Sequence, residues 1–294
     1  MATELSKGSL FDPVLVKDLV NKVKGKSSLA VLSAQTPIPF NGRKEFTFTM
    51  DSEIDVVAEN GKKTHGGVSV EPITIVPIKV EYGARISDEF MLASEEEQLD
   101  ILKAFNDGFA RKIASGLDLM AFHGINPRTG EASAVIGGNH FDNLVEQTVE
   151  YDAAKPDVSI EAAIAMVEGN EGDVSGIAIA PAVRSDLAKM TKSTGEKIYP
   201  DFAFGGKPAS LGAHGLDINK TVAHGNTDKA IVGDFANMFK WGYAKTIPME
   251  IIKYGDPDNS GRDLKGYNQI YIRAEAYLGW GILDKNSFAR VTNE

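Results

Sequence analysis

The side chains best suited to chemistry are the carboxylates of the segment DPDNSG, residues 256–261. Asp256, Asp258 and Ser260 repeat the spacing of the first ligands of a calcium-binding loop, in which oxygen atoms surround the ion. Position twelve of such a loop needs a glutamate that binds through both oxygens, and here that position is Tyr267. The segment is therefore predicted to be a plain turn, and no metal site is expected.

Other potential catalytic groups also lack the spacing that a site requires. No HExxH pair is present, so each histidine is expected to be solvated or hydrogen-bonded: His65, His123, His140, His214 and His224. The glycines of EGNEGDVSG, residues 168–176, lack the strand-then-helix setting of a phosphate loop, and the chain has no G-x-S-x-G motif. The sequence predicts no catalytic residue, no metal and no cofactor, and the chain is not expected to be an enzyme.

Composition excludes further classes. The chain has 294 residues, of which 43% are hydrophobic, so it can form a sizeable core. Cysteine is absent, which removes disulfides, thiolate metal sites and cysteine nucleophiles. The net charge of −10 argues against a protein that wraps nucleic acid. No apolar run has the length of a membrane span, and the N-terminus lacks a secretory signal pattern.

Two amines, Lys62 and Lys63, follow the pair Asn60-Gly61 between two alternating apolar and polar runs. Asn-Gly in this setting predicts a β-hairpin with a type I′ turn, in which both central residues have positive φ. The hairpin is expected over about 42–83, with arms of about 15 residues that reach roughly 50 Å at 3.3 Å per residue. The two lysines are interpreted as charges that keep the tip soluble.

The segment that follows predicts one long amphipathic helix of about 27 residues, roughly 40 Å at 1.5 Å per residue. Its apolar residues recur every three or four positions: Leu99, Leu102, Phe105, Phe109, Ile113, Leu117 and Met120. Ser94 and Glu97 form a capping box at the start, and Gly124 followed by Pro127 ends the helix. A helix of this length is expected to support other elements.

The remainder of the chain predicts an α+β fold. The first 36 residues have little periodicity and predict an extended arm with a short helix at about 13–23. Beyond residue 157, short helices (SIEAAIAMVEGN, AVRSDLAKMTK) alternate with strands (GIAIAP, KAIVGDF, MEIIKYG). The segment NQIYIRAEAYLGWGIL is predicted to be a pair of strands.

The arm and the hairpin are not expected to be stable alone, because an isolated two-stranded hairpin is marginal in water. Both elements need partners outside their own domain. The sequence therefore predicts self-association.

Several segments follow one another in a specific order between about residue 37 and residue 292: VVAENG, ITIVPIKVEYGARISDEFM, DGFARKIASGLDLMAFHGINPRTGEAS, GIAIAPAVRSDLAKMTKSTGEKIYPDF, LGAHGLDIN, KAIVGDFANMFKWGYAKTIPMEI and YIRAEAYLGWGILDKNSFARVT. Their order and spacing resemble those of the major capsid proteins of tailed bacteriophages. The resemblance implies the Hong Kong 97 type fold.

That fold implies five parts: an N-terminal arm at 1–37, an extended hairpin called the E-loop at 38–86, a P-domain with a spine helix at 87–134, an A-domain at 135–261, and a return to the P-domain at 262–294. The E-loop would lie across the P-domain of a neighbouring subunit. The implied function is structural: subunits assemble as pentamers and hexamers into an icosahedral head that encloses double-stranded DNA without specific binding.

The resemblance also implies partners and a location. The expected inter-subunit contacts are on the hairpin: Asn60, Gly61, Lys62, Lys63, Ile73 and Ile75. The capsid-like pattern begins too early to leave room for a built-in scaffolding segment, so either a separate scaffolding protein acts, which is the expected partner, or the shell assembles unaided. A portal is a further expected partner, and no membrane is involved. The protein is expected in the virion, after synthesis in the cytoplasm of a host bacterium.

Some relatives bond a hairpin lysine to an asparagine of a neighbour, with a buried glutamate that accepts the proton. Lys62 or Lys63 could supply the amine here, and Asn286 the amide. Glu275 and Glu294 stand at no telling spacing from it, and tip lysines are expected to be solvated. The prediction is a shell without covalent cross-links.

An encapsulin-type nanocompartment shell is the alternative within the same fold. Such shells tend to begin with an amphipathic helix that docks cargo. Residues 24–40 instead predict an extended arm, which favours the phage capsid.

Overall fold

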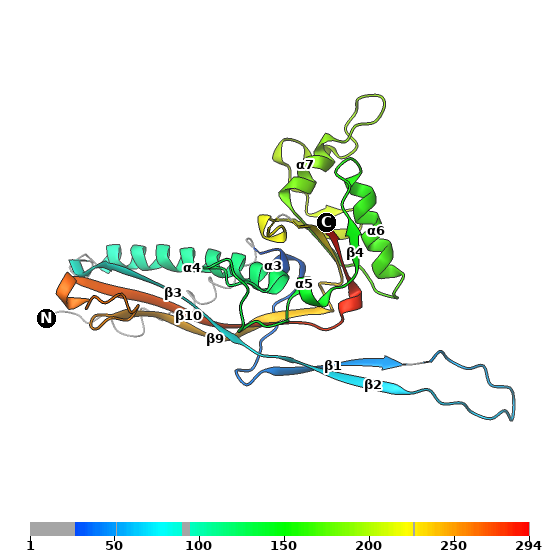
Figure 1. The fold of residues 1–294 in the computed structure, drawn as a ribbon, viewed down its shortest axis with the longest axis horizontal. Helices are drawn as coiled ribbons and strands as arrows, with labels where there is room; N and C mark the ends of the chain where they lie inside the picture. The colour runs from blue at the N-terminus through cyan, green and yellow to red at the C-terminus, as the bar shows by residue number, and fades with distance from the viewer. Residues whose placement is uncertain (1–26, 51, 90–94, 226, 294) are drawn as a thin grey trace.

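The computed structural model describes residues 27–50, 52–89, 95–225 and 227–293. It consists of an elongated body, a lobe that rises from one end of the body, and a two-stranded ribbon that projects beyond that end (Figure 1). The predicted helix at 13–23 and Ser94 of the predicted capping box lie outside the described residues.

The body is a three-stranded antiparallel sheet with a long helix along one face (Figure 1). The strand order is β3 (Ile78–Ser87), β10 (Gln269–Ile282) and β9 (Phe239–Ile252). The helix, α4 (Glu95–His123), shares a core with the alternate residues of β10 that face it. A 3-10 turn, η4 (Lys265–Tyr267), precedes β10.

The predicted long helix and its apolar stripe are confirmed. Five of the predicted stripe residues are buried: Leu102, Phe109, Ile113, Leu117 and Met120. Gly124 ends the helix in the left-handed region with φ +65°, which a glycine adopts without a steric penalty. The predicted strand pair near the C-terminus is wrong: β10 is one continuous strand of 14 residues, because β3 and β9 pair with it along both edges.

The lobe is a six-stranded mixed sheet between helices. Its strand order is β4 (Thr148–Glu150), β11 (Phe288–Thr292), β8 (Asp228–Gly233), β5 (Gly176–Ile179), β7 (His214–Ile218) and β6 (Ser210–Leu211). Helices α6 (Pro156–Glu168) and α7 (Pro181–Lys189) share one apolar core with this sheet. The other face of the sheet joins the core of the body, together with α3 (Ser28–Leu32) and α5 (Phe141–Leu144). Three 3-10 turns complete the lobe: η2 (Pro200–Gly205), η3 (Lys220–Val222) and η5 (Lys285–Ser287).

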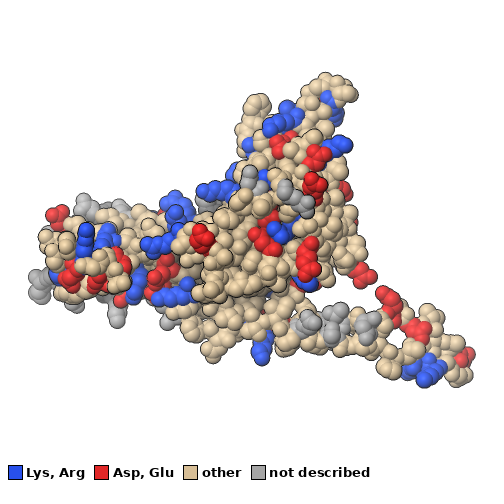
Figure 2. Space-filling model, viewed as in Figure 1, with Lys and Arg blue, Asp and Glu red and all other residues tan. Residues whose placement is uncertain are grey.

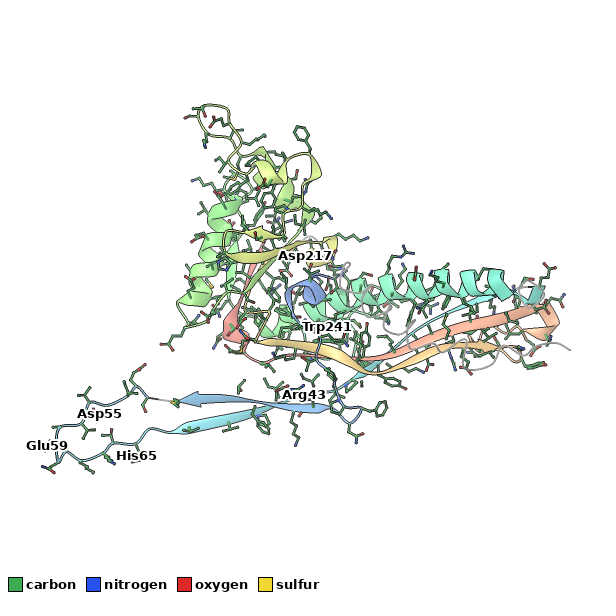
Figure 3. The ribbon with its side chains drawn as sticks, turned by 180° about the vertical axis from the view of Figure 1, so that it is seen from behind. Arg43, Asp55, Glu59, His65, Asp217 and Trp241 are labelled. Atoms are coloured by element: carbon green, nitrogen blue, oxygen red, sulfur yellow. The ribbon has the colours of Figure 1, made fainter. Side chains whose placement is uncertain are left out.

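The described part of the N-terminal arm packs against the rest of the subunit. The prediction of an extended arm is therefore wrong for this part. Residues 28–32 form helix α3, and Leu29 is completely buried. The chain then runs beside β9, where the N–H of Thr36 donates to the carbonyl of Trp241 at 2.8 Å. Trp241 lies where α3 and β9 meet (Figure 3). The arm was predicted to be extended because its local periodicity is weak; tertiary packing determines its conformation.

The ribbon is shorter than predicted. Strands β1 (Arg43–Met50) and β2 (Val68–Ile75) pair over eight residues each, and residues 52–67 form an open loop without ladder pairs. The remainder of the predicted second arm is β3, which pairs with β10 instead. The tip is not a type I′ turn, because only Asn60 has a positive φ (+67°) and the N–H of Gly61 donates to the carbonyl of Ala58.

Candidate functional site

The ribbon exposes one apolar face. Phe46 lies opposite Pro72 and Met50 lies opposite Val68, so these four side chains lie on the same face of the ribbon. Val70 lies on that face as well, two residues from Val68. The exposed fractions are 64% for Phe46, 70% for Met50, 55% for Val68 and 50% for Val70. We call these five residues the apolar ribbon face, and a contiguous exposed patch of this kind is typical of an interaction surface.

The base of the opposite ribbon face packs on its own subunit. Ile75 is 1% exposed, and a Cβ added to Gly281 of β10 would come within 2.7 Å of its side chain. Ile73 is half-buried beside the same glycine. Ile75, expected as an inter-subunit contact, therefore belongs to the core of its own subunit, and the glycines of β10 make room for it.

The other four expected contact residues lie at the far end of the ribbon. Asn60, Gly61, Lys62 and Lys63 are all exposed. Figure 3 shows that neighbouring tip side chains, such as Glu59, point away from the body. The charged side chains of the ribbon gather toward this end (Figure 2). Residues 59–63 are polar or glycine and exposed, whereas exposed apolar side chains occur both on the open loop, at Ile54 and Val56, and on the apolar ribbon face of the paired strands.

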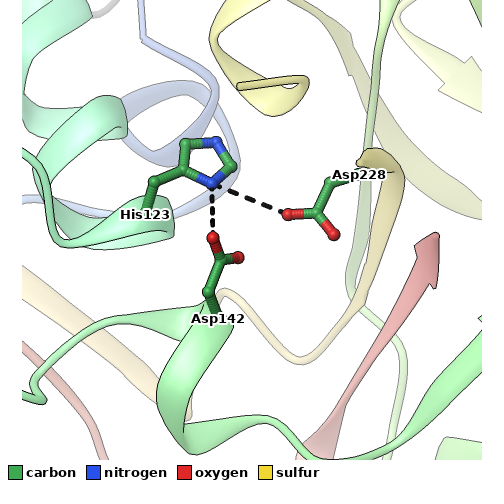
Figure 4. Close-up of side chains that lie close together, drawn as sticks. All are labelled: His123, Asp142 and Asp228. Atoms are coloured by element: carbon green, nitrogen blue, oxygen red, sulfur yellow. Dashed lines mark hydrogen bonds and ion pairs between the residues drawn. The ribbon is translucent and has the colours of Figure 1, made fainter. Parts of the chain in front are cut away.

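A buried polar cluster lies where the lobe meets the end of α4. The side chain of His123 is 2% exposed, and its Nδ1 lies 2.8 Å from Oδ2 of Asp142 and 3.6 Å from Oδ2 of Asp228 (Figure 4). Arg290 of β11 reaches the other oxygens: its Nη2 lies 3.0 Å from Oδ1 of Asp142 and 2.9 Å from Oδ1 of Asp228. We call these four residues the charge ring, because positive and negative groups alternate around it when all are ionised.

The charge ring shifts the proton affinity of its members. Burial acts to lower the pKa of His123, but the hydrogen bond and charge of Asp142 outweigh burial and raise that pKa. Burial opposes ionisation of Asp142 too, yet its hydrogen bond to His123 holds its pKa below the ordinary value. Burial, followed by the hydrogen bond and charge of Asp142, raises the pKa of Asp228 to about 7. As a unit, the charge ring therefore binds a proton in the neutral range.

The same imidazole and carboxylates could be considered as metal ligands, because their donor atoms lie within 4.8 Å of one another. Two observations favour a proton. The 2.8 Å separation between His123 Nδ1 and Asp142 Oδ2 is that of a hydrogen bond. Arg290 already supplies one positive charge, so protonated His123 balances the two carboxylates, whereas a divalent ion would leave excess buried charge.

A second buried acid, Asp118, lies one helical turn before His123. Its carboxylate is completely buried and accepts hydrogen bonds from Ser27 Oγ at 2.5 Å, Ser28 N at 2.9 Å and Leu29 N at 3.2 Å. Asp118 thus lies at the N-terminus of α3, where the helix dipole favours a negative charge. Burial outweighs these donors and raises the pKa of Asp118 to about 6.

Thr221 of η3 joins Asp118 to the charge ring. Its hydroxyl donates to Asp118 Oδ2 at 2.6 Å, and its carbonyl accepts a hydrogen bond from His123 Nε2 at 2.9 Å. We call Asp118, Thr221 and the charge ring the buried junction. It connects the N-terminal segment, the end of α4 and the sheet of the lobe.

The side chain of Arg85, on β3, binds the segment 256–261, whose first residues have the spacing of calcium-loop ligands. Its guanidinium donates to Asp256 at 2.6 Å, to both oxygens of Asp258, to Ser260 at 2.6 Å and to the carbonyl of Arg262 at 2.8 Å. The hydrogen bond from Arg85 lowers the pKa of Asp258. The predicted turn is confirmed, and its oxygen atoms bind a guanidinium from the neighbouring strand.

The histidines differ in their surroundings. His65 is exposed, and His123 and His214 are hydrogen-bonded, as expected for all five. His140 is half-buried and hydrogen-bonded to the backbone of Phe122, while its Nδ1 is buried without a hydrogen-bond partner. Burial lowers the pKa of His140, which keeps this ring neutral beside the charge ring.

Sequence reasoning missed Asp118, Arg290 and Arg85. A signal for Asp118 was present: it follows Ala110 and Ala114 at four-residue spacing, and all three are completely buried. A single acid within a row of small apolar residues indicates a buried carboxylate with local donors. Arg290 and Arg85 gave no such signal, because their partners are distant in the sequence.

Comparisons with known proteins agree with this architecture. The model of the phage capsid family matches residues 8–293. A solved structure from Mycobacterium phage Ogopogo is 33% identical, with 92% of each chain covered and a TM-score of 0.79. One from Gordonia phage Cozz is 24% identical, covering 92% of this chain and 87% of the other, with a TM-score of 0.75. The capsid of a native GTA particle, computed with C5 symmetry, shares the fold with a TM-score of 0.64. It is 15% identical, and the match covers 90% of this chain and 89% of the other. No curated protein sequence matches the chain.

The chain belongs to the phage capsid family. It is a structural capsid protein of the Hong Kong 97 type, one that self-assembles into a shell and is located in the virion capsid. The encapsulin alternative is not favoured, because the structures described above come from phages and a GTA particle. Among the described helices, none combines the length and the apolar character that a membrane span requires.

Proposed function

We propose that this chain forms the icosahedral head of a tailed bacteriophage and that the apolar ribbon face is the main contact between subunits. The observation that carries this proposal is the exposure of Phe46, Met50, Val68 and Val70 on one face of a ribbon that packs on its own subunit only at the base of its other face. Covering a large apolar side chain is worth about 1.5–3 kcal/mol. A neighbouring subunit that covers this face would stabilise the ribbon and the shell together.

The parts implied by the resemblance fit the proposal with adjusted boundaries. The ribbon and its tip would act as the E-loop, the body as the P-domain and the lobe as the A-domain. By sheet membership, β3 and β9 (Phe239–Ile252) belong to the body, and β11 (Phe288–Thr292) belongs to the lobe. The tip residues Asn60, Gly61, Lys62 and Lys63 would make polar contacts at the far end of the interface.

In the assembled head, subunits would group as pentamers and hexamers. We further propose that a separate scaffolding protein and a portal take part, and that synthesis occurs in the cytoplasm of the host bacterium. The net charge of −10 supports a wall that encloses duplex DNA without binding it tightly, because a chain with a net negative charge repels phosphate. Unassembled subunits should therefore show no salt-resistant DNA binding in a filter-binding assay.

The assembly claim is tested with the double variant Phe46→Ser, Val70→Ser. We expect purified full-length subunits to remain folded but to form no closed particles in negative-stain electron microscopy. The matched control is Phe46→Leu, Val70→Ile, which keeps the face apolar and should assemble like the parent. Normal particles from the serine variant would contradict the proposal.

A further inference from the structure

The buried junction is the polar contact through which α4 of the body reaches the lobe. His123 is on the last turn of α4, whereas Asp228 and Arg290 belong to β8 and β11 of the lobe sheet. Asp142 lies on α5, between the two. Any relative movement of the lobe and α4 must break contacts of the charge ring.

The hydrogen bonds of His123 favour its protonated form. Nε2 faces the carbonyl of Thr221 at 2.9 Å, and a carbonyl can only accept a hydrogen bond. Nδ1 faces only carboxylate oxygens, from Asp142 and Asp228. A neutral imidazole has a single N–H, so one of its nitrogens would direct a lone pair at an acceptor. The imidazolium donates from both nitrogens and fits this environment.

The other titratable groups around His123 do not replace its charge. The ring centroid of His224 is 5.5 Å away, and His140 and Arg290 act on the same carboxylates. Asp118, on the same helix, reaches Thr221 from the opposite side. Of the groups that face Asp142 and Asp228 in the described residues, Arg290 holds its charge throughout the neutral range, whereas His123 can lose its proton.

We propose that protonated His123 is a clasp that holds the lobe against the end of α4, and that loss of this proton loosens the joint without unfolding either part. Deprotonation leaves Asp142 and Asp228 with Arg290 as the remaining cation of the charge ring. It also removes one of the two hydrogen bonds that tie α4 to Thr221 and Asp142. The contact between the lobe and α4 then has two states, one tight and one loosened, and the pH determines which state is populated.

The direction of the pH effect follows from the raised pKa of His123. A group whose pKa is raised on folding adds stability that is fully present below its unfolded value of 6.5 and is lost as the pH rises through its folded value. The raised pKa of Asp228, about 7 against 3.8, acts in the same direction. The lowered pKa of Asp142 acts only below 3.8 and leaves the neutral range unaffected.

The first test is a histidine NMR titration of the full-length unassembled subunit, with the five ring signals assigned by single substitutions. We expect His123 to titrate above 6.5 and its chemical shifts to report the doubly protonated ring below that midpoint. A midpoint at or below 6.5 would overturn the proposal. This measurement uses the parent protein, so it remains decisive if a variant at His123 fails to fold.

The second test is hydrogen exchange by mass spectrometry at two pH values, with intrinsic exchange rates corrected. In the parent, peptides that contain β8 and β11 should exchange faster at pH about 8.5 than at pH about 6, because the proposal has the joint loosen as His123 loses its proton with rising pH. The variant His123→Gln should exchange fast at both, and the exposed control His65→Gln should behave like the parent. Exchange that is independent of pH in the parent, or stoichiometric Zn²⁺ binding that His123→Gln abolishes, would contradict a proton clasp.

Discussion

The ribbon and the buried junction depart from an ordinary globular surface and core in opposite ways. The ribbon exposes apolar side chains such as Phe46, whereas the junction buries charged ones such as Asp118 and Asp228. The junction offsets part of this cost internally, because Asp118 accepts a hydrogen bond from the backbone of Ser28 and Arg290 lies 2.9 Å from Asp228. Among the described residues, no part of the same chain covers the apolar ribbon face, although Ile75 at the base of the opposite face packs against β10. The junction thus stabilises its own subunit, whereas under the proposed function the ribbon is stabilised by a neighbour.

Deletion of the ribbon should have the largest effect on assembly and a small effect on the subunit. Residues 47–71 would be replaced by a short turn, which keeps Ile75 in place against β10. We expect no closed shells by electron microscopy, while the thermal midpoint of the subunit changes by only a few degrees. Closed shells of normal size from this variant would show that the ribbon is dispensable.

Removal of a buried carboxylate should have the opposite pattern, with a large effect on the subunit. Asp118→Ala leaves the donors of Ser27, Ser28 and Thr221 without their acceptor. We expect the free energy of unfolding, measured with urea, to fall by about 3 kcal/mol.

The matched control for this change is Asp173→Asn, at an exposed position of the lobe. Its effect should stay within about 0.5 kcal/mol. If the two variants proved equally stable, Asp118 would not hold the N-terminal segment to α4 and η3.

The smallest expected effect concerns the ribbon tip. Lys62 and Lys63 are exposed, and an amine must lose its solvation and its proton before it can attack an amide. Particles of the parent and of the variant Lys62→Arg, Lys63→Arg should both give one band at 31.6 kDa after boiling in detergent. A ladder of larger bands in the parent that the arginine variant lacks would reveal a covalent cross-link.

The sequence predicted those features that depend on local periodicity. The stripe from Leu102 to Met120 defines α4, because a helix that buries one face must repeat its apolar residues every three or four positions. The turn at 256–261 was predicted for a similar reason, since Asp, Asn and Gly favour turns in any context.

Features that depend on distant partners were not predicted. The ribbon's strands end at Met50 and Val68 although the alternating pattern continues, and β3 pairs with β10 across nearly 200 residues. Ile75 and Val70 are both apolar, but Ile75 lies on the ribbon face that packs against the glycines of β10, whereas Val70 lies on the opposite, exposed face. Asp142, Asp228 and Arg290 come together only through the fold, so their spacing in the sequence carries no signal.

The central claim is that the apolar ribbon face exists to be covered by another subunit, and a cryo-electron microscopy map of assembled particles tests it most directly. We expect Phe46, Met50, Val68 and Val70 to contact the body of a neighbouring subunit, with their exposed fractions falling to those of core residues. A closed shell in which these side chains remain in solvent, or fold back onto their own subunit, would contradict the claim.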